Sequence, residues 1–593
     1  MIKLSDYVIS FLEDRGIKDI FMLSGGFCLP LVDSVGKSGI NHVCNLHEQA
    51  AAVGAEAYAQ YKNSPGVCLV TAGPGGTNTI TGVASAWLDS IPMIVLSGQV
   101  QSKDIKGSRG VRQIGFQEID MVSIVRSITK YATTITNPKD VKYVIERAWH
   151  EATTGRQGPV WIEIPLDVQS KMVDIEALDG YSPPEKNNHK EKIKNKVGEF
   201  YKLLKNSKRP VILAGNGIRS AKAEKEFLHL AELLKIPVLT TWKSIDFLDE
   251  QHPLYVGRPG LIGQRGANFS QQTSDLFISI GARLDFGQTA FNHKNFARFA
   301  KKIIVDIDQA EIDKMDFVVD CEINFDAGEF IREAVNQFEE AGNFSSWLDK
   351  CKNWHKQYPV VTQDYWEQKE CVNNYVLIDV LSDLMRPSDL LIPGSSGACS
   401  EVTMQAFRTK KGMRIFNSEG LGSMGFGIAA AIGGCIASGG KETICIDGDG
   451  GFIMNIQELE TVRRLNLPIK FFVLNNGGYV SIRNSQKKHF DLELASSEDG
   501  GVTLPEFQKV VKSYGLKYFK VENQKDIHNK IQRVLDMDGP VVCEIMMLHT
   551  HESLPRNSTH KREDGTFISL PMEDLLPLLP RDEFEGNMSI VNE

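Results

Sequence analysis

The sequence lacks the patterns that mark several large classes of protein. Its ten cysteines include no C-x-x-C pair, so neither a zinc site nor a disulfide framework is indicated, and reduced cytoplasmic thiols are expected. No basic block stands out beyond Lys190–Lys196 and the formal net charge is −9, which argues against a nucleic-acid or anionic-membrane partner. The N-terminus has no basic stretch followed by an apolar one, so no secretory signal is predicted.

One uncharged stretch, residues 420–440, is long enough to span a bilayer as a helix. Gly, Ala and Ser dominate this stretch, however, and such small side chains favour close packing against other parts of the protein. We therefore predict a buried helix in this part of the chain, and no membrane partner.

With 593 residues the chain is too long for one core, and three domains are the natural expectation. Alternating helix and strand patterns predict doubly wound parallel sheets and thus an α/β fold. In the first unit they predict helices over residues 4–15, 29–36 and 48–61 and strands over 19–23, 42–45, 66–71 and 93–97. We place the domains at 1–170, 197–341 and 373–549, with a lysine-rich linker at 179–196 and a tail at 550–593 that is either a lid or a packed arm.

The most informative pattern joins Gly-Asp-Gly at 448–450 to Asn-Asn at 475–476. Its flanks predict two strands with a helix between them, so both ends lie at the carboxyl edge of a parallel sheet, where ligands bind. Mg²⁺ takes oxygen ligands and bridges protein oxygens to substrate phosphates. The available oxygens belong to Asp449, Asn476 and the carbonyl of Gly478, and three glycines allow a diphosphate to approach the backbone, namely Gly448, Gly450 and Gly451.

Just upstream, Gly420, Gly422 and Gly425 form the pattern G-x-G-x-x-G between a predicted strand at 414–417 and a predicted helix. An acidic residue, Asp447, follows about twenty residues later. This spacing is the fingerprint of dinucleotide binding. A flavin- or NAD-dependent oxidoreductase is therefore one hypothesis for the function.

Taken together, these segments resemble those of thiamine-diphosphate-dependent enzymes, in particular the catalytic subunits of acetolactate synthases. The family's diphosphate motif runs from Gly-Asp-Gly to Asn-Asn, and Glu419–Gly427 is similar to the segment that precedes it. The resemblance covers nearly the whole chain and matches the order of its three α/β units. It implies a pyrimidine-binding first domain, a central domain and a diphosphate-binding third domain, with active sites between the subunits of a homodimer or homotetramer.

The resemblance also implies roles for single residues beside the cofactor. Glu48 matches the glutamate that protonates the aminopyrimidine N1′, although the helix dipole alone would favour a glutamate in a first turn. Asn78 ends a glycine-rich turn, Thr71–Asn78, that would lie beside the pyrimidine, although a plain strand-to-helix turn explains its glycines as well. In the third domain, Met424 would support the bent cofactor, with Gly420 and Gly422 beside it.

Three further residues are expected near the substrate. Gly25 and Gly26 resemble the loop that closes over the bound keto acid. Gln117 lies in a Phe-Gln-Glu-x-Asp signature and would reach the reaction centre, unless it is a surface residue. Residues 105–125 contain no histidine, whereas related decarboxylases that release free aldehyde carry adjacent histidines there. Carboligation is therefore favoured over aldehyde release.

In the central domain, residues 260–268, 281–285 and 306–308 line up with the FAD-binding stretches of acetolactate synthases. Arg283 would meet the flavin diphosphate, and Asp306 or Asp308 would lie near the adenosine. The family's second arginine in this region is replaced by Gly287. We expect FAD in a mainly structural role.

The wall of the acceptor site departs from the family. Acetolactate synthases carry a tryptophan nine residues after the last motif asparagine, where this chain has Ser485. Tyr479, Arg483 and Gln486 make this wall more polar, unless Arg483 is a surface residue. A ketosugar or other polar ketone is therefore an alternative acceptor.

The leading hypothesis is a carboligase that uses Mg²⁺ and thiamine diphosphate. It would decarboxylate pyruvate and transfer the hydroxyethyl (acetyl) unit to a carbonyl acceptor, which is a second keto acid or another ketone. The remaining alternatives are the oxidoreductase described above and a catalytically silent paralogue or regulatory subunit.

Overall fold

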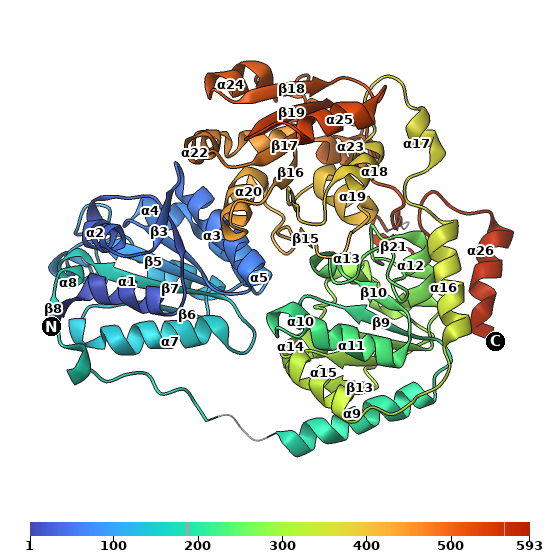
Figure 1. Ribbon diagram of the computed structural model, residues 1–593, viewed down its shortest axis with the longest axis horizontal. Helices are drawn as coiled ribbons and strands as arrows, with labels where there is room; N and C mark the ends of the chain where they lie inside the picture. Colours follow the sequence, from blue (N-terminus) through green and yellow to red (C-terminus); the bar gives the residue numbers. More distant parts are fainter. Residues whose placement is uncertain (186–188, 562–563, 593) are drawn as a thin grey trace.

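The computed structural model describes residues 1–185, 189–561 and 564–592 of the chain. Within this described part, three parallel sheets form the centres of three α/β domains (Figure 1). Most of their central strands are buried on both faces and consist of continuous apolar runs, as expected when helices cover both sides of a parallel sheet. The predicted α/β fold of three parallel-sheet domains is therefore confirmed.

The first sheet has the strand order β3-β2-β4-β5-β7-β6. Its strands are β2 (Asp19–Met22), β3 (Asn41–Cys44), β4 (Gly66–Val70), β5 (Met93–Gln99), β6 (Tyr131–Thr134) and β7 (Pro159–Pro165). The helices are α1 (Leu4–Asp14), α2 (Leu29–Lys37), α3 (Glu48–Lys62), α4 (Pro74–Asn78), α5 (Ile80–Leu88), α6 (Met121–Val125), α7 (Val141–Thr153) and α8 (Leu166–Gln169). A short antiparallel pair joins β1 (Ile2–Lys3) to β8 (Met172–Val173).

The central sheet has the order β10-β9-β11-β12-β13. Its strands are β9 (Pro210–Ala214), β10 (Val238–Thr240), β11 (Leu276–Ile280), β12 (Lys301–Val305) and β13 (Cys321–Ile323). The helices are α9 (Lys190–Lys205), α10 (Gly217–Ser220), α11 (Glu224–Leu234), α12 (Arg265–Gln272), α13 (Phe286–Thr289), α14 (Gln309–Asp313), α15 (Ala327–Asn336) and α16 (Ser345–Gln357).

Helix α9 corrects the predicted linker. Residues 186–188 of that linker lie outside the described residues, but from Lys190 onward the chain is helical. Ile193, Val197 and Phe200 are buried in the core of the central domain. The lysines face away from this apolar stripe, so a lysine-rich composition here belongs to an amphipathic helix.

The third sheet has the order β15-β14-β16-β17-β19-β18. Its strands are β14 (Leu390–Pro393), β15 (Arg414–Ile415), β16 (Thr443–Gly448), β17 (Ile469–Asn475), β18 (Lys517–Val521) and β19 (Val541–Met546). The helices are α17 (Gln363–Glu367), α18 (Asn374–Leu384), α19 (Ala398–Ala406), α20 (Phe426–Ala437), α21 (Asp449–Ile453), α22 (Leu459–Leu465), α23 (Val480–Phe490), α24 (Phe507–Ser513) and α25 (Ile527–Leu535), with a 3₁₀ turn, η8 (Ile456–Glu458), before α22.

The tail leaves the third domain but packs on the central one. It contains β20 (Thr559–Lys561), β21 (Phe567–Ser569) and α26 (Arg581–Met588), and α26 lies beside α16 in Figure 1. Trp354 of α16 donates from its indole N–H to Asn587 Oδ1 at 2.7 Å. Met572 and Leu575 are buried. Of the two predicted alternatives, this single chain therefore has the packed arm.

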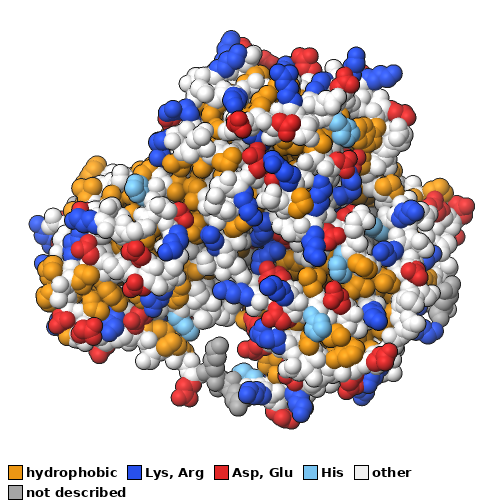
Figure 2. Space-filling model, viewed as in Figure 1, with side chains coloured by type: hydrophobic (Ala, Val, Ile, Leu, Met, Phe, Trp, Pro, Cys, Tyr) orange, Lys and Arg blue, Asp and Glu red, His pale blue; other side chains and the backbone are white. Residues whose placement is uncertain are grey.

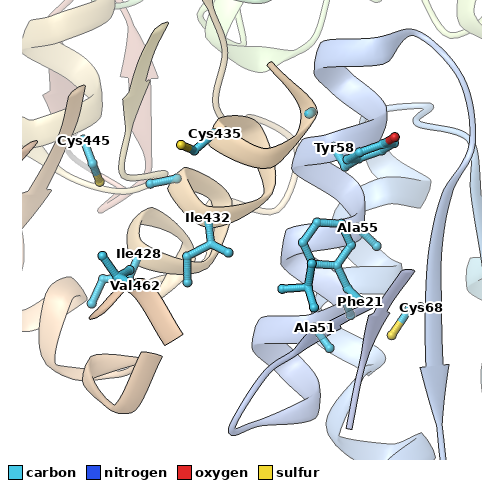
Figure 3. Close-up of a cluster of buried hydrophobic side chains, with 14 of the residues drawn as sticks. Phe21, Ala51, Ala55, Tyr58, Cys68, Ile428, Ile432, Cys435, Cys445 and Val462 are labelled. Atoms are coloured by element: carbon cyan, nitrogen blue, oxygen red, sulfur yellow. The ribbon is translucent and has the colours of Figure 1, made fainter. Parts of the chain in front are cut away.

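Helices α3 and α20 join the first and third domains through their small side chains (Figure 3). Ala50, Val53 and Ala57 of α3 pack with Ala429 and Ala430 of α20 in one buried cluster. On the other side of α3, Ala51 and Ala55 lie beside Phe21 of the first sheet, and Ile428 and Ile432 of α20 belong to the same cluster as these residues. At Gly433 the two helices approach so closely that a Cβ atom would lie 2.1 Å from the carbonyl oxygen of residue 54. The stretch 420–440 therefore contains the buried, closely packed helix predicted from its composition.

The surface mixes both signs of charge. In Figure 2, acidic and basic side chains are interspersed over the visible face of all three domains, and basic ones also gather near the centre. In the described part of the chain, no helix combines the length and the apolar character needed to cross a membrane.

Candidate active site

The loops that follow β16 and β17 lie side by side because these strands are neighbours in the third sheet. Asp449 begins α21, and its Oδ2 accepts hydrogen bonds from the backbone N–H groups of Asn476, Gly477 and Gly478 at 3.0, 2.8 and 3.1 Å. Burial raises the pKa of Asp449 to about 6, although these backbone hydrogen bonds act in the opposite direction. The Gly-Asp-Gly and Asn-Asn segments therefore form one loop pair.

The side chain of Asn476 contributes a buried oxygen atom that has no hydrogen-bond partner among the described residues. This atom is Oδ1, and the side chain is almost inaccessible to solvent. An unsatisfied buried polar atom costs about 1–3 kcal/mol, so native proteins rarely keep one without a reason. A carboxylate and an amide oxygen in one loop pair are ligands that a hard divalent cation prefers.

The three glycines of this loop serve different purposes. A Cβ atom on Gly448 would meet nothing within 4 Å, so this residue leaves open space beside the loop. A Cβ atom on Gly450 would lie 2.3 Å from the ring of Tyr479 and 3.3 Å from the methyl carbon of Met424. At Gly451 it would lie 2.6 Å from a carboxylate oxygen of Asp447. Packing within the protein, rather than the approach of a ligand, thus requires glycine at 450 and 451.

The glycine-rich segment before α20 is anchored to the first domain. Asp89 accepts hydrogen bonds from the backbone N–H groups of Glu419 and Gly420 at 2.9 and 2.8 Å. Gly422 and Gly425 have positive φ angles of 62° and 84°, and the helix begins only at the next residue, 426. In the dinucleotide fingerprint the glycines follow a strand directly and open the helix. Here β15 ends at Ile415 and α20 begins only after the third glycine, so the geometry argues against the dinucleotide hypothesis.

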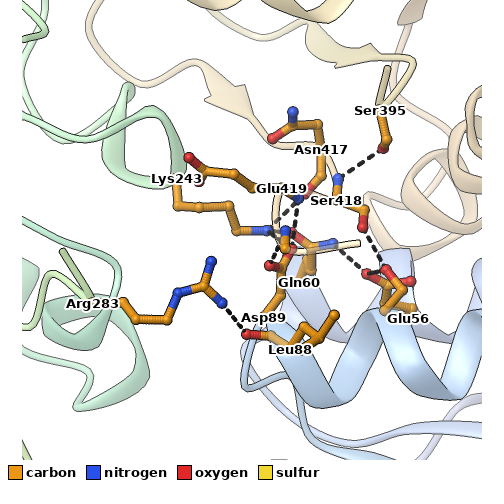
Figure 4. Close-up of polar contacts among 12 residues, drawn as sticks. Glu56, Gln60, Leu88, Asp89, Lys243, Arg283, Ser395, Asn417, Ser418 and Glu419 are labelled. Atoms are coloured by element: carbon orange, nitrogen blue, oxygen red, sulfur yellow. Dashed lines mark hydrogen bonds and ion pairs between the residues drawn. The ribbon is translucent and has the colours of Figure 1, made fainter. Parts of the chain in front are cut away.

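Lys243 completes a polar junction where the three domains meet (Figure 4). Its ammonium group donates to Gln60 Oε1 at 2.6 Å and Asp89 Oδ2 at 3.0 Å in the first domain, and to the Asn417 carbonyl at 2.6 Å in the third. Glu56 lies beside them and accepts from Ser85 Oγ at 2.9 Å. Burial raises the pKa of Glu56 to about 8.

A second group of predicted residues gathers at the carboxyl edge of the first sheet. Glu48 begins α3 and is buried, and its Oε2 accepts a hydrogen bond from Asn78 Nδ2 at 2.9 Å. A Cβ atom on Gly25 would lie 2.6 Å from Thr71, which starts the glycine-rich turn. A Cβ atom on Gly26 would meet nothing within 4 Å, so this residue borders open space.

The loop that carries Gln117 packs over this turn. Gln117 has a positive φ of 66°, and a Cβ atom on Gly73 would lie 2.6 Å from its carbonyl oxygen. The neighbouring Glu118 is buried and accepts from the backbone N–H of Ile114 at 2.7 Å and from that of Lys106. The structure therefore brings Glu48, Asn78 and the Gln117 loop to one edge of the first sheet.

The first-domain group and the Asp449–Asn476 loop pair lie in different domains of one chain. Among the described residues, no hydrogen bond joins Glu48 or Asn78 to Asp449 or Asn476. Large apolar side chains are exposed near both groups, on the loop before Gln117 and on α23 with the loop after it. They are Val111, Ile114, Phe116, Ile482, Phe490, Leu492 and Leu494.

A pocket runs along the carboxyl ends of the central strands. Arg283 lines it and donates to Asp285 Oδ2 and to the Leu88 carbonyl oxygen, each at 2.6 Å. Asp306 follows β12 in the same pocket, and burial raises its pKa to about 6. Asp308 instead pairs with Arg156 at 2.9 Å.

The stretch 260–268 does not join this pocket, contrary to our expectation. Arg265 donates to the carbonyl oxygens of Leu575 at 3.1 Å and Pro577 at 2.6 Å in the tail. Asn268 Nδ2 donates to the Met572 carbonyl at 2.7 Å. Arg265 and Asn268 therefore hold the tail, and among the described residues none of 260–268 lines the pocket.

The predicted polar acceptor wall is also wrong in part. Arg483 is buried, and its guanidinium group donates to the carbonyl oxygens of His549, Ser496 and Asn476. Gln486 bonds to the backbone of Leu494 in both directions. Both side chains therefore hold the loops around α23 in place and have few groups left for a ligand. Arg483 is not a surface residue either.

Comparison with known proteins decides the family. Three family models match the chain in order: the thiamine pyrophosphate enzyme N-terminal TPP binding domain at residues 2–124, the central domain at 197–334, and the C-terminal TPP binding domain at 395–545. The chain belongs to the thiamine pyrophosphate enzyme family. It is 34% identical over 560 residues to a probable acetolactate synthase large subunit of Methanococcus aeolicus, covering 91% of both chains. It is 32% identical over 563 residues to the acetolactate synthase large subunit of Cyanidium caldarium, covering 92% of this chain and 94% of the relative.

The described residues of this thiamine pyrophosphate enzyme fit the groups that its family implies. The unpartnered Oδ1 of Asn476, a residue whose backbone N–H binds the Asp449 carboxylate, fits a divalent cation that carries phosphates. In the central pocket, Asp306 at a strand end fits the ribose hydroxyls of an adenine nucleotide. Arg283 is the basic group nearby, although Asp285 already occupies part of its donor capacity.

Sequence reasoning missed the three-domain junction of this enzyme. Asp89 ends an otherwise apolar helix segment, and Lys243 follows a strand of the central domain. Each residue therefore resembles an ordinary charged residue at the protein surface. The only local pattern that could have indicated the role of Asp89 is an acidic residue directly after an apolar helix. Its partners lie more than a hundred residues away along the chain, and no local pattern predicts such a contact.

Proposed function

We propose that this chain is a carboligase that uses Mg²⁺ and thiamine diphosphate, decarboxylates pyruvate and transfers the two-carbon unit to a second keto acid. The observation that carries this proposal is the unpartnered Oδ1 of Asn476 in the loop that binds the Asp449 carboxylate, within the C-terminal TPP binding domain. Bound thiamine diphosphate supplies the nucleophilic carbon that adds to the keto group of pyruvate.

In this proposal, Asp449, Asn476 and the Gly478 carbonyl hold the Mg²⁺ ion, and the ion binds the diphosphate. The backbone N–H groups on Oδ2 of Asp449, together with that of Gly450 on its Oδ1, fix this carboxylate in one orientation. Gly448 leaves room for the phosphates. Gly420, Gly422 and Met424 support the cofactor from the other side, and the contact of Met424 with Gly450 supports this role.

Glu48 is the proposed proton donor to the aminopyrimidine N1′. It is buried, and Asn78 holds one of its two oxygens, so the other is available to a ligand. Proton transfer by a positioned side chain typically contributes about 10²–10⁴-fold to a rate. Gln117 and the Gly25–Gly26 loop lie at the same sheet edge and would face the keto acid.

The active sites are proposed to form between two copies of the chain. Among the described residues, no hydrogen bond joins Glu48 to Asp449 within one chain, although the proposed chemistry needs both at one cofactor. The exposed apolar side chains beside both groups are the kind of surface that a partner covers.

FAD is the proposed ligand of the central pocket, with Arg283 near its diphosphate and Asp306 near its ribose. The ketosugar alternative loses its support because Arg483 and Gln486 are engaged within the protein. A second keto acid is therefore the proposed acceptor.

A direct assay tests the reaction. Purified protein is incubated with pyruvate, Mg²⁺ and thiamine diphosphate, and CO₂, acetaldehyde and acetolactate are measured. Acetolactate with little acetaldehyde is expected. Acetaldehyde alone would replace the carboligase by a decarboxylase, and no CO₂ release would overturn the proposal.

A complementation assay tests the shared sites. Glu48→Gln and Asp449→Ala are each expected to be inactive, but in a mixed dimer one site keeps both wild-type residues. An equal mixture should therefore recover about one quarter of wild-type activity, since about half of the dimers are mixed. If subunit exchange is shown but no activity returns, each site lies within one chain.

A further inference from the structure

The buried carboxylate of Glu458 reaches across from the third domain to the first. It lies at the end of η8 and is fully inaccessible to solvent. It accepts hydrogen bonds from Leu46 N at 2.8 Å, His47 N at 3.1 Å and Asn45 Nδ2 at 3.0 Å. Thr461 Oγ1 of its own domain donates a fourth at 2.8 Å. Four donors replace the water that this carboxylate loses on burial.

The three first-domain donors occupy the positions directly before Glu48. The loop 45–47 connects β3 to α3, so its backbone sets where the first residue of α3 begins. The His47 side chain caps that helix by accepting from Gln49 N at 3.1 Å. Glu458 thus fixes the backbone on one side of Glu48, while Asn78 fixes its side chain on the other.

The same carboxylate is tied to the metal loop of its own chain. Helix α21 begins at Asp449, and Asn455 and η8 follow it without a break. Asn455 is buried and donates to the Gly425 carbonyl at 2.7 Å, next to Met424. A short connection, in which Phe452 and Asn455 are buried, therefore leads from Asp449 to Glu458.

We propose that Glu458 is a positioning residue for Glu48 of its own chain. In the proposed dimer this Glu48 serves one active site, whereas Asp449 of the same chain serves the other. This inference rests on the proposed function, in which each site combines Asp449 of one chain with Glu48 of the other.

The first test compares Glu458→Gln with the control Thr461→Val, which removes only the bond within the third domain. Both are assayed for thiamine diphosphate affinity, for hydrogen–deuterium exchange at C2 of the bound cofactor, and for melting temperature. Glu458→Gln should slow C2 exchange about 10- to 100-fold, since it removes the negative charge that strengthens all four of these hydrogen bonds. Its cofactor affinity should stay within about threefold of wild type, as the metal loop is untouched. Thr461→Val should match wild type.

Unchanged C2 exchange in a folded Glu458→Gln protein would overturn the inference. If that variant does not fold, Asn45→Ala removes one of the three cross-domain bonds and should slow exchange to a smaller extent; no slowing there would also overturn it. A wild-type protein without C2 exchange would instead refute the proposed function itself.

The second test uses the mixed dimer of Glu48→Gln and Asp449→Ala, whose one working site takes Glu48 from the Asp449→Ala chain. Adding Glu458→Gln to that chain should reduce the recovered activity about tenfold or more. Adding it to the Glu48→Gln chain should leave the activity unchanged. Equal losses from both placements would show a general structural role and overturn the inference.

Discussion

At the scale of single residues, Glu48 carries the clearest expectation. Glu48→Gln should keep the fold and nearly the same cofactor affinity, because the amide has the same shape and still accepts from Asn78. It cannot donate the required proton as a carboxylic acid does, so turnover should fall about 10²–10⁴-fold. Steady-state CO₂ release and cofactor titration measure the two effects. Wild-type turnover in this variant would show that Glu48 has been assigned wrongly.

Glu56 in the three-domain junction should make stability depend on pH. Burial raises its pKa in the folded protein from 4.5 to about 8, so the folded state keeps a proton that the unfolded state releases. The free energy of unfolding should therefore fall as the pH rises from about 4.5 to about 8, and this decline should be shallower in Glu56→Gln. Urea unfolding at several pH values measures the difference. Parallel curves for the two proteins would contradict the prediction.

At the scale of elements, the contact between α3 and α20 depends on the absence of a side chain. Gly433→Ala would place a Cβ atom 2.1 Å from the carbonyl oxygen of Gly54. The helices would have to move apart, at a cost of about 1–3 kcal/mol in the free energy of unfolding. Gly198→Ala is the matched control, because that helical glycine of α9 meets nothing within 4 Å and an alanine there should be neutral or stabilising. Equal stability of both variants would contradict the close approach.

The regular elements were predictable because their patterns are local. The helix that begins at Glu48 and the strands on either side of the Asp449 motif follow from apolar periodicity and turn residues. The lysine-rich composition before residue 197 predicts a linker, whereas the spacing of Ile193, Val197 and Phe200 indicates helix α9. The roles of Arg483 and Glu458 could not be predicted, since their partners come from other loops; Asn45 and Glu458 are 413 residues apart in sequence.

At the scale of the whole molecule, Lys243 should make the three domains unfold together. Lys243→Met removes its bonds to the first and third domains and leaves Asp89 without its buried cation. Breaking a buried ion pair in this way costs about 3–5 kcal/mol. Calorimetry should then show a lower melting temperature and more than one transition.

Lys205→Met is the control for this change, because Lys205 pairs with Glu339 at the surface. Such exposed pairs contribute about 0–1 kcal/mol. A single, unshifted transition in Lys243→Met would show that the junction does not couple the domains.

The packed arm lies against a domain that is not its neighbour in the sequence. Although the last helix follows the third domain in sequence, its Asn587 accepts from Trp354 of α16 and donates to Tyr358 directly after that helix, both in the central domain. A fluorophore attached near the end of α26 would therefore rotate with the central domain. Paired with a second dye on α24, it would act as a spectroscopic ruler between the two domains, even though both dyes are borne by the same carboxyl-terminal third of the polypeptide.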